Sequence, residues 1–600
     1  MNRSRRSSLL CAMACVLCVS FVNAVARAQV LEQLPDDAVV VVKIKDLQSV
    51  STKVAALAQQ FGISQARPEF SDPLQALGNM SGIKQGMDKS GDAAFVVLNG
   101  EWKEQQPPFL ILLPISNYQE FIGNFANPKK DGEFDVIHMK GEGGEEEKED
   151  TYVSDWGKYA SLSPTKDALK KGTGLKVTGA AAKELETKDL TAFFNFKVLG
   201  PKLLPQLKEN KDKLIDQITD AMSKAPNANP KFAPVVKAMF QQYIAIAEGF
   251  LTDAQSAVIS LDLSNDGIAT TSLAEFTPGS YSANAVTALR NTDGPLTAGL
   301  PDGKYIFYGG LTINGPEMTK LMDDLVAPVV VELNKLGDDS KGVTTYLNSM
   351  HTILSNITGE AVGVIAPSGP LGQSPLLQAV YSITGDSKKL TVGMKEMTES
   401  TDQLMGLLGA SGFPKFNSTF TPNAKTIEGV SFDAVQLKPD PAAANNSPEA
   451  MQMQQMMAFM YGPNGATTVY GAVDDQHVVA GLDLDDDTLA AAVKAIKAND
   501  DPVGKQPQVA AANKFFPKSR VGVFYFAVDT LATTVADYAR KMGMPVPLNL
   551  KPNLPPLAAA LSTEGTTIRV DGYISADTVS NMVAAVMQVM MRQGGGPGGL

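Results

Sequence analysis

The chain alternates between short runs of apolar residues and longer segments in which apolar residues recur every three or four positions. The first pattern is typical of β-strands and the second of amphipathic helices. After Leu34-Pro35-Asp36-Asp37, the apolar run 38–44 predicts a strand and the segment 47–61 predicts a helix. Pairs of strands separated by short loops follow, which indicates antiparallel hairpins, because parallel strands need a long crossover.

This succession of predicted elements occurs twice. Leu300-Pro301-Asp302-Gly303 opens a second series, with a strand at 305–308 and a helix after Gly315-Pro316-Glu317. Further segments match in the same order: 91–97 with 359–365, 109–114 with 376–383, 158–162 with 477–482, 191–196 with 521–526, and 257–275 with 561–574. Ordered self-similarity of this kind is the sequence signature of an internal duplication.

We therefore predict an α+β fold made of two tandem duplicated units. The first unit spans 29–292 and the second 297–593, joined at the turn-rich stretch 291–295. Many strands alternate apolar with small or polar residues, so each unit is expected to contain a mainly antiparallel curved sheet with helices on one face. Parallel pairing of some strand–helix–strand units stays open. The glycine-rich segment 594–600 predicts a flexible tail.

The first residues predict export. Arg3, Arg5 and Arg6 precede an apolar run at 9–22, and Ala26-Arg27-Ala28 supplies a small-residue cleavage site. This arrangement is typical of a signal peptide, here 1–28. The run is shorter than the roughly 20 residues needed to cross a bilayer, so removal is favoured over anchoring. The mature protein is expected in the periplasm, the cell envelope or outside the cell, and the general and twin-arginine export routes both stay open.

Cysteine content and charge exclude several classes of function. All three cysteines (Cys11, Cys15 and Cys18) lie in the predicted signal peptide, so the mature chain is cysteine-free and without disulfides or thiolate chemistry. The net charge is −12, and it becomes −16 without the arginines of 1–28. Because an acidic protein repels nucleic acid, we expect no nucleic-acid partner. No later segment is long and apolar enough to predict a transmembrane segment in the mature chain.

The residues that usually carry catalysis or bind metals are sparse. The only histidines, His138, His351 and His477, are far apart in the sequence and have no ligand-like spacing. A Ser-His-Asp triad therefore has little to draw on, and no nucleophile elbow or phosphate-binding loop is present. We predict no catalytic residue, no metal ligand and no cofactor.

Two acidic segments have a simpler structural interpretation than a cation site. The segment 262–267 resembles the start of a calcium loop, but position twelve is Leu273, so a hairpin turn is favoured. Asp483, Asp485, Asp486 and Asp487 precede a predicted helix at 488–498, where carboxylates cap free amides.

Methionines form the most unusual local pattern. Met453, Met456, Met457 and Met460 recur at the spacing of one helix face. Such a face packs in a core, binds a partner or an apolar ligand, or holds copper(I) through thioethers. These four residues are our candidate surface for an unknown protein partner or apolar ligand. The same alternatives apply to Met582, Met587, Met590 and Met591.

The Leu-Pro-Asp opening and the following strand, at 34–42 and 300–307 with a fainter echo at 516–517, resemble a family of uncharacterised exported bacterial proteins. The resemblance implies an α+β domain outside the cytoplasm and brings no active-site residues. We expect a non-enzymatic binding or structural protein of the cell envelope or periplasm. The alternative is a carboxylate-dependent hydrolase of envelope polymers, using two Asp or Glu residues as glycosidases do.

Overall fold

The computed structural model describes residues 30–101, 107–138, 150–223, 230–367, 375–409, 416–439, 452, 460–462, 465–541, 543 and 550–592. The predicted signal peptide 1–28 and tail 594–600 lie outside these residues. The chain forms two compact units: unit 1 comprises Met1–Lys202 and Ala254–Glu275, and unit 2 comprises Leu203–Asp253 and Phe276–Leu600. Residues 203–253 and 276–292, which the sequence pattern assigns to the first unit, thus group with unit 2.

Unit 1 combines ten strands with short helices. Its elements are β1 (Val40–Ile44), α2 (Leu47–Gln60), α3 (Ile63–Ala66), α4 (Pro73–Ser81), β2 (Ala93–Val97), β3 (Phe109–Pro114), α5 (Tyr118–Ile122), β4 (Lys129–Asp131), β5 (Phe134–Ile137), β6 (Thr151–Asp155), β7 (Tyr159–Ser163), α6 (Gly179–Thr187), β8 (Leu190–Asn195), β9 (Ala254–Ser264) and β10 (Gly267–Phe276). The helix α7 (Phe196–Ser223) begins in unit 1 and continues into unit 2.

The strands of unit 1 pair in the order β4-β5-β6-β7-β3-β2-β1-β8-β9-β10. The pairing is antiparallel, as the short loops predict. The first strand along the chain, β1, therefore lies between β2 and β8 in the interior of the sheet, with Val42 opposite both Phe95 and Ala192.

The sheet of unit 1 packs on both faces, so the expectation of helices on one face is wrong here. Strand β3 is apolar at every position, as is usual for strands of a sheet that is buried on both faces. Its Leu110 and Leu112 belong to a core that includes Leu185 of α6. Ile111, which points the opposite way, lies against a second core that includes Phe121 of α5.

Unit 2 contains the remaining strands and the longer helices. Its elements are α8 (Ala233–Asp253), α9 (Tyr281–Ala288), β11 (Tyr305–Thr312), α10 (Gly315–Asn334), α11 (Lys341–Asn356), β12 (Ile357–Ile365), β13 (Gln378–Gly385), α12 (Ser387–Gly409), β14 (Phe416–Ile427), β15 (Val430–Pro439), β16 (Ala466–Ala472), β17 (His477–Leu482), α14 (Asp486–Ala498), α15 (Pro507–Asn513), β18 (Gly522–Phe526), α16 (Val528–Lys541), β19 (Leu557–Glu564), β20 (Thr567–Ser575) and α17 (Ala576–Arg592).

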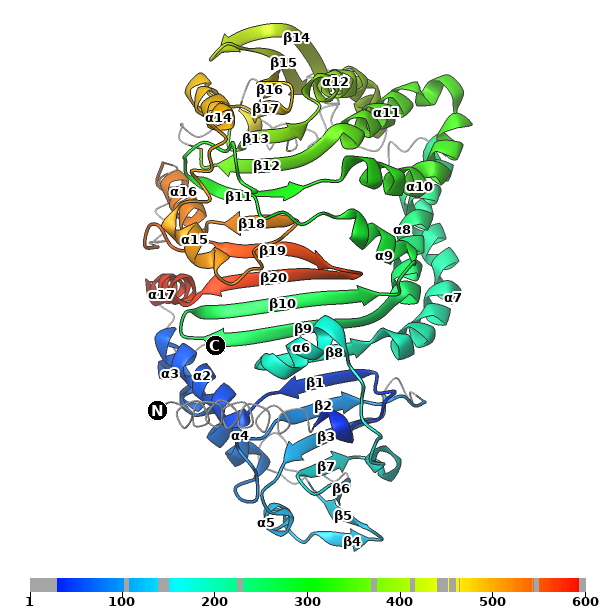
Figure 1. Ribbon diagram of the computed structural model, residues 1–600, viewed down its shortest axis with the longest axis vertical. Coiled ribbons are helices and arrows are strands. Elements are labelled where there is room, and N and C mark those ends of the chain that lie inside the picture. The colour runs from blue at the N-terminus through cyan, green and yellow to red at the C-terminus, as the bar shows by residue number, and fades with distance from the viewer. Residues whose placement is uncertain are drawn as a thin grey trace, which may run out of the picture. The chain divides into compact units, whose positions relative to one another are not determined.

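The strands of unit 2 pair in the order β14-β15-β16-β17-β13-β12-β11-β18-β19-β20, again antiparallel. This is the order of unit 1 with ten added to each label. In unit 2, α10 and α11 lie near one end of the strands, and α14, α16 and α17 lie near the other (Figure 1). The α+β architecture with antiparallel sheets agrees with the sequence prediction.

Helices cover both faces of this second sheet as well. Leu390 of α12 packs against Ile383 and Val478 on one face. On the other face, Gly481 leaves room for Leu489 of α14, since an added Cβ would meet that side chain at 2.9 Å. Within the described residues, no helix is long and apolar enough to cross a membrane.

Helix starts follow the sequence signals closely but not always residue by residue. Asp485 is the N-cap of α14 and accepts a hydrogen bond from the Thr488 amide at 2.7 Å, as expected. At α5, Ser116 and Gln119 have the spacing of a capping box, but they do not form one. The cap is Asn117, which accepts from the Gln119 and Glu120 amides, while Ser116 donates to the Met87 carbonyl.

Candidate functional site

The central strands of unit 1 leave one apolar face partly open to solvent. We call it the open face of unit 1. Strand register places its side chains on the same side of the sheet, because residues directly opposite each other share a face and alternate residues return to it. Its members are Val40, Val42, Phe95, Phe109, Phe194 and Ile259.

The exposure of these side chains is high for residues of their type. Phe95 is 40% exposed and Ile259 is 51% exposed, while the other members are half-buried. The rings of Phe95 and Phe109 contact each other with centroids 5.4 Å apart. Burying apolar surface is favourable by about 25 cal/mol per Å². A row of such side chains left open is therefore a candidate binding surface.

Unit 2 has an equivalent open face at the corresponding strands. Val570 is 44% exposed, and the rings of Phe307 and Phe524 stack at 6.2 Å with an interplanar angle of 17°. The open face of unit 2 comprises Phe307, Val362, Val364, Phe524, Phe526, Leu561 and Val570.

One carboxylate lies on this second face. Glu360 lies two residues before Val362 on β12 and therefore points to the same face. Its cross-strand neighbours are Leu311 and Ile383. Burial raises the pKa of Glu360 above its ordinary value. The pKa of nearby Tyr381 is also raised, mainly by burial and to a smaller extent by the charge of Glu360. In the described part of the chain, Glu360 has no hydrogen-bond or ion-pair partner. An apolar ligand on this face would therefore meet a carboxyl group that has no partner among the described residues.

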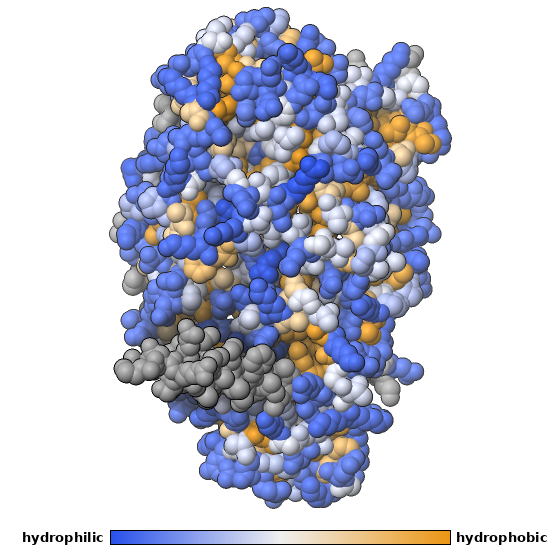
Figure 2. Space-filling view, in the orientation of Figure 1, coloured by the Kyte–Doolittle hydropathy of each residue, from blue (hydrophilic) through white to orange (hydrophobic). Residues whose placement is uncertain are grey.

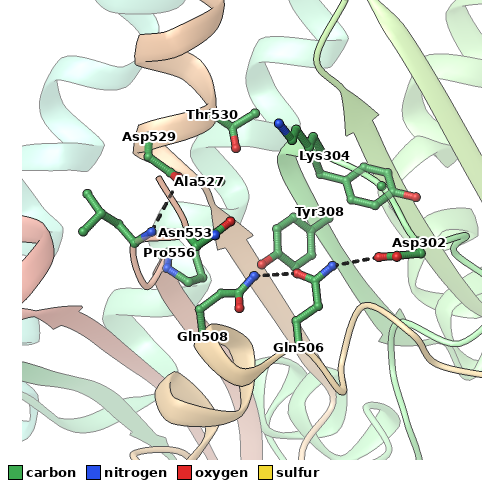
Figure 3. A pocket seen from close by; sticks show the side chains of 13 residues that line it. Asp302, Lys304, Tyr308, Gln506, Gln508, Ala527, Asp529, Thr530, Asn553 and Pro556 are labelled. Atoms are coloured by element: carbon green, nitrogen blue, oxygen red, sulfur yellow. Dashed lines mark hydrogen bonds between the residues drawn. The ribbon is translucent and has the colours of Figure 1, made fainter. Parts of the chain in front are cut away.

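A separate polar pocket lies on the opposite face of the unit 2 sheet. It has a volume of about 300 Å³ (Figure 3). Its lining comes from β11 and the residues just before it, from the first turn of α15 and the residue before it, from the start of α16, and from the segment before β19. Tyr308 follows Phe307 directly on β11, and successive side chains of a strand point to opposite faces. Tyr308 therefore points away from the open face. Figure 1 shows α15 in front of the strands. Figure 2 shows the same side of the molecule, and its surface is largely polar.

A chain of hydrogen bonds fixes one wall of this pocket. Gln508 Nε2 donates to Gln506 Oε1 at 2.8 Å, and Gln506 Nε2 donates to Asp302 Oδ1 at 3.2 Å. Figure 3 shows these three side chains in a row along one edge, with Lys304 and Thr530 toward the other. The chain of bonds orients both amides, because each uses a defined donor or acceptor.

Two buried side chains complete the pocket. Asp529, 8% exposed at the start of α16, accepts a hydrogen bond from the Leu554 amide at 3.4 Å. The ring of Tyr308 stacks on Tyr525 with centroids 4.9 Å apart, and Tyr525 is held by a 2.6 Å hydrogen bond to Asn513. Burial, with Tyr525 and Asp529 nearby, raises the pKa of Tyr308, so its hydroxyl stays a donor at neutral pH.

Unit 1 has a larger, mainly apolar hollow of about 500 Å³. It lies between the 3-10 turn Leu31–Gln33, residues 173–178 and α6, and its apolar lining includes Leu31, Leu175 and Val177. Lys43 lies at its wall with the ammonium group bonded to the Leu185 carbonyl at 2.8 Å. The side chains of this hollow border the core of unit 1.

The methionine surface falls mostly outside the described residues. Met453, Met456 and Met457 lie there, so the surface they were predicted to form stays a prediction. Met460 is half-buried, and its carbonyl accepts hydrogen bonds from the Leu376 and Leu377 amides at 2.8 and 3.2 Å. On α17, Met582 and Met587 are half-buried.

The other polar candidates make ordinary local contacts. The three histidines each lie beside one aspartate: His138 by Asp150, His351 by Asp323, and His477 by Asp474. Asp262 contacts Lys188 at 3.3 Å in the β9–β10 hairpin. No group of three or more potential metal-ligating side chains is found within the described ranges.

Sequence reasoning missed both open faces and the polar pocket. The apolar runs 39–42 and 109–113 carried a signal for the open face of unit 1, because a strand apolar at consecutive positions presents apolar side chains on both faces. The pocket had no such signal, since Gln506 and Asp302 are 204 residues apart.

Comparison with known proteins gives little to add to this geometry. No protein family and no curated protein matches the chain. Among solved structures, crystal form III of TP0453 matches 50% of this chain and 100% of its own, at 9% identity and a TM-score of 0.18. Crystal form I of TP0453 matches 49% and 98%, at 9% identity and a TM-score of 0.16. Likeness at these TM-scores carries no argument about fold or function.

Proposed function

We propose that this chain is an exported, non-enzymatic protein that binds an apolar ligand on the open faces of its sheets. The observation that carries the proposal is the row of half-exposed aromatic and aliphatic side chains on β1, β2, β3, β8 and β9, with Phe95 and Ile259 the most exposed. The outward positions of a water-facing sheet would ordinarily be polar.

We further propose that the two units arose by duplication. The identical pairing order of ten strands supports this, as does the matching succession of sequence segments. In each unit the helix after the third strand and a helix between the seventh and eighth strands (α6 in unit 1, α14 in unit 2) lie on opposite faces. The repeat explains why each unit has an open face at the same strands, so two ligand sites per chain are expected.

The chemistry of the open faces favours a flexible hydrocarbon ligand. The faces present methyl groups and ring faces, and the interior strands have their backbone groups already paired in the sheet. A ligand therefore gains from burial rather than from hydrogen bonds. An acyl chain laid across neighbouring strands is the simplest molecule with this property.

Binding of a neutral apolar dye, N-phenyl-1-naphthylamine, to the chain beginning at Gln29 tests the proposal. We expect the dye to bind, palmitic acid to displace it, and Ile259→Glu to weaken binding to unit 1 at least tenfold. Leu77→Glu is the matched control, because Leu77 is 55% exposed on α4 of the same unit but lies outside the open face.

Three outcomes would contradict parts of this proposal. Absence of dye binding, or equal losses in Ile259→Glu and Leu77→Glu, would remove the open face as the site. A co-purified protein in place of a lipid, seen by native mass spectrometry, would favour a protein partner. Turnover of a glycoside substrate that is lost in Asp529→Asn would favour the alternative hydrolase. The same mass spectrum tests export, since the mature chain is expected to begin at Gln29.

A further inference from the structure

We propose that the polar pocket of unit 2 binds a neutral, polyhydroxylated molecule of the size of one sugar ring. This site is separate from the open faces, since Tyr308 and Phe307 point to opposite sides of β11. The inference therefore stands or falls independently of apolar binding.

The pocket is lined by hydrogen-bonding groups that have no partner among the described residues. In the part of the chain that the structure describes, the Tyr308 hydroxyl, the Lys304 ammonium group and the Thr530 hydroxyl have no hydrogen-bond partner, although all three residues line the cavity. Each amide in the Gln508–Gln506–Asp302 chain also retains an N–H that the chain does not use.

Two side chains of the lining, Tyr308 and Asp529, are held in place by the fold. Tyr308 is 4% exposed and stacked on Tyr525, so its hydroxyl has little freedom to reorient away from the cavity. Asp529 is nine-tenths buried and accepts one long hydrogen bond from Leu554, which leaves acceptor capacity on the carboxylate. Preorganised groups of this kind lose little entropy when a ligand binds.

The mixture of groups selects the ligand class. The lining carries both donors and acceptors: amide N–H groups, a phenol, an ammonium group and two carboxylates. A hydroxyl group can donate and accept at once, so adjacent hydroxyls match such a lining. An anionic phosphate would meet Asp302 and Asp529, and an apolar molecule would leave the polar groups without water or partners. The volume of about 300 Å³ lies at the lower end for small-molecule sites.

Saturation-transfer NMR and calorimetry with glucose, galactose, mannose, N-acetylglucosamine and myo-inositol test this inference on the chain beginning at Gln29. We expect at least one to bind with millimolar affinity. Tyr308→Phe keeps the ring stack but removes the hydroxyl, and Gln508→Leu removes an amide. Each is expected to weaken binding at least fivefold, and their folding is verified by circular dichroism.

Tyr470→Phe serves as the matched control, because Tyr470 lies in the core of the same unit, away from the pocket, and its hydroxyl is buried without a partner among the described residues. It should bind as the unaltered chain does. Failure of all five compounds to bind overturns the inference. So does unchanged affinity in both pocket variants, or tighter binding of glucose 6-phosphate than of glucose. Tighter binding of oligosaccharides than of the free sugars would identify a glycan end as the source.

Discussion

The ammonium nitrogen of Lys43 lies 2.8 Å from Asp92 Oδ2, and both side chains are buried in unit 1. Lys43 comes from β1 and Asp92 from the turn before β2, and the ammonium group also donates to the Leu185 carbonyl. Asp92 Oδ1 accepts from the Asp46 amide at 2.9 Å. The pair thus ties the edge of α6 and the start of α2 to the centre of the sheet.

Removal of one partner should destabilise unit 1 strongly. Asp92→Ala leaves Lys43 buried and unpaired, which costs about 3–5 kcal/mol. Urea unfolding followed by tryptophan fluorescence measures this selectively, because the only tryptophans, Trp102 and Trp156, both belong to unit 1. The control is Asp167→Ala, which breaks an exposed pair with Lys170 and should change stability by less than about 1 kcal/mol. Equal effects of the two substitutions would contradict the assignment of a structural role to the buried pair.

Asp483→Asn should stabilise unit 2 above pH 6. Burial raises the pKa of Asp483 to about 6, and its Oδ2 is buried without a partner among the described residues. Because the folded-state pKa lies above the unfolded one, stability falls as pH rises from about 4 to above 6. Asparagine keeps the acceptor for the Thr467 amide and tolerates the φ of 51° at this position.

Scanning calorimetry at pH 4 and pH 8 would show this effect. We expect Asp483→Asn to gain about 1–2 kcal/mol at pH 8 and close to nothing at pH 4. A gain that is the same at both values would mean that the carboxylate does not titrate in this range. Asp487→Asn, in the exposed first turn of α14, is the control and should show no such pH dependence.

Glu360→Leu should strengthen dye binding to unit 2 and make it independent of pH. Since burial raises the pKa of Glu360, the neutral form persists to higher pH than for an ordinary glutamate. Binding of an apolar dye to the unaltered chain is therefore expected to weaken as pH rises through that raised pKa. Titration of N-phenyl-1-naphthylamine at several pH values measures this, with Glu317→Leu on α10 as the control. A pH profile unchanged by Glu360→Leu would place the titrating group elsewhere.

The sequence predicted the antiparallel strand succession well because hairpins are local. Segments 91–97 and 359–365, matched on residue pattern alone, became β2 and β12, which occupy the same place in the two pairing orders. The helix predicted at 488–498 is α14, at Asp486–Ala498, with its aspartate cap as expected. Here the signal lay within a few residues of the element that it specified.

The sites could not be predicted in the same way. The expectation of helices on one face rested on strands that alternate apolar with polar residues. Strand β3 is instead apolar throughout and packs against a core on each face. Whether an outward apolar position such as Ile259 is covered depends on where distant helices dock, and no local pattern records that. The polar pocket joins Asp302, Gln506 and Asp529 only after the strands between them have paired.

Gly310→Ala should destabilise unit 2, whereas Gly249→Ala should not. A Cβ built on Gly310 of β11 would overlap the backbone carbonyl oxygen of Leu296, and backbone cannot move aside cheaply. We expect a loss of more than about 2 kcal/mol, as for other overpacked positions. Beyond the backbone of its own helix, no atom lies within 4 Å of a Cβ added at Gly249 in α8, so alanine should stabilise the helix by up to about 1 kcal/mol. Calorimetric unfolding of the two variants measures both effects, and a tolerated Gly310→Ala would show that the segment at Leu296 can withdraw from β11.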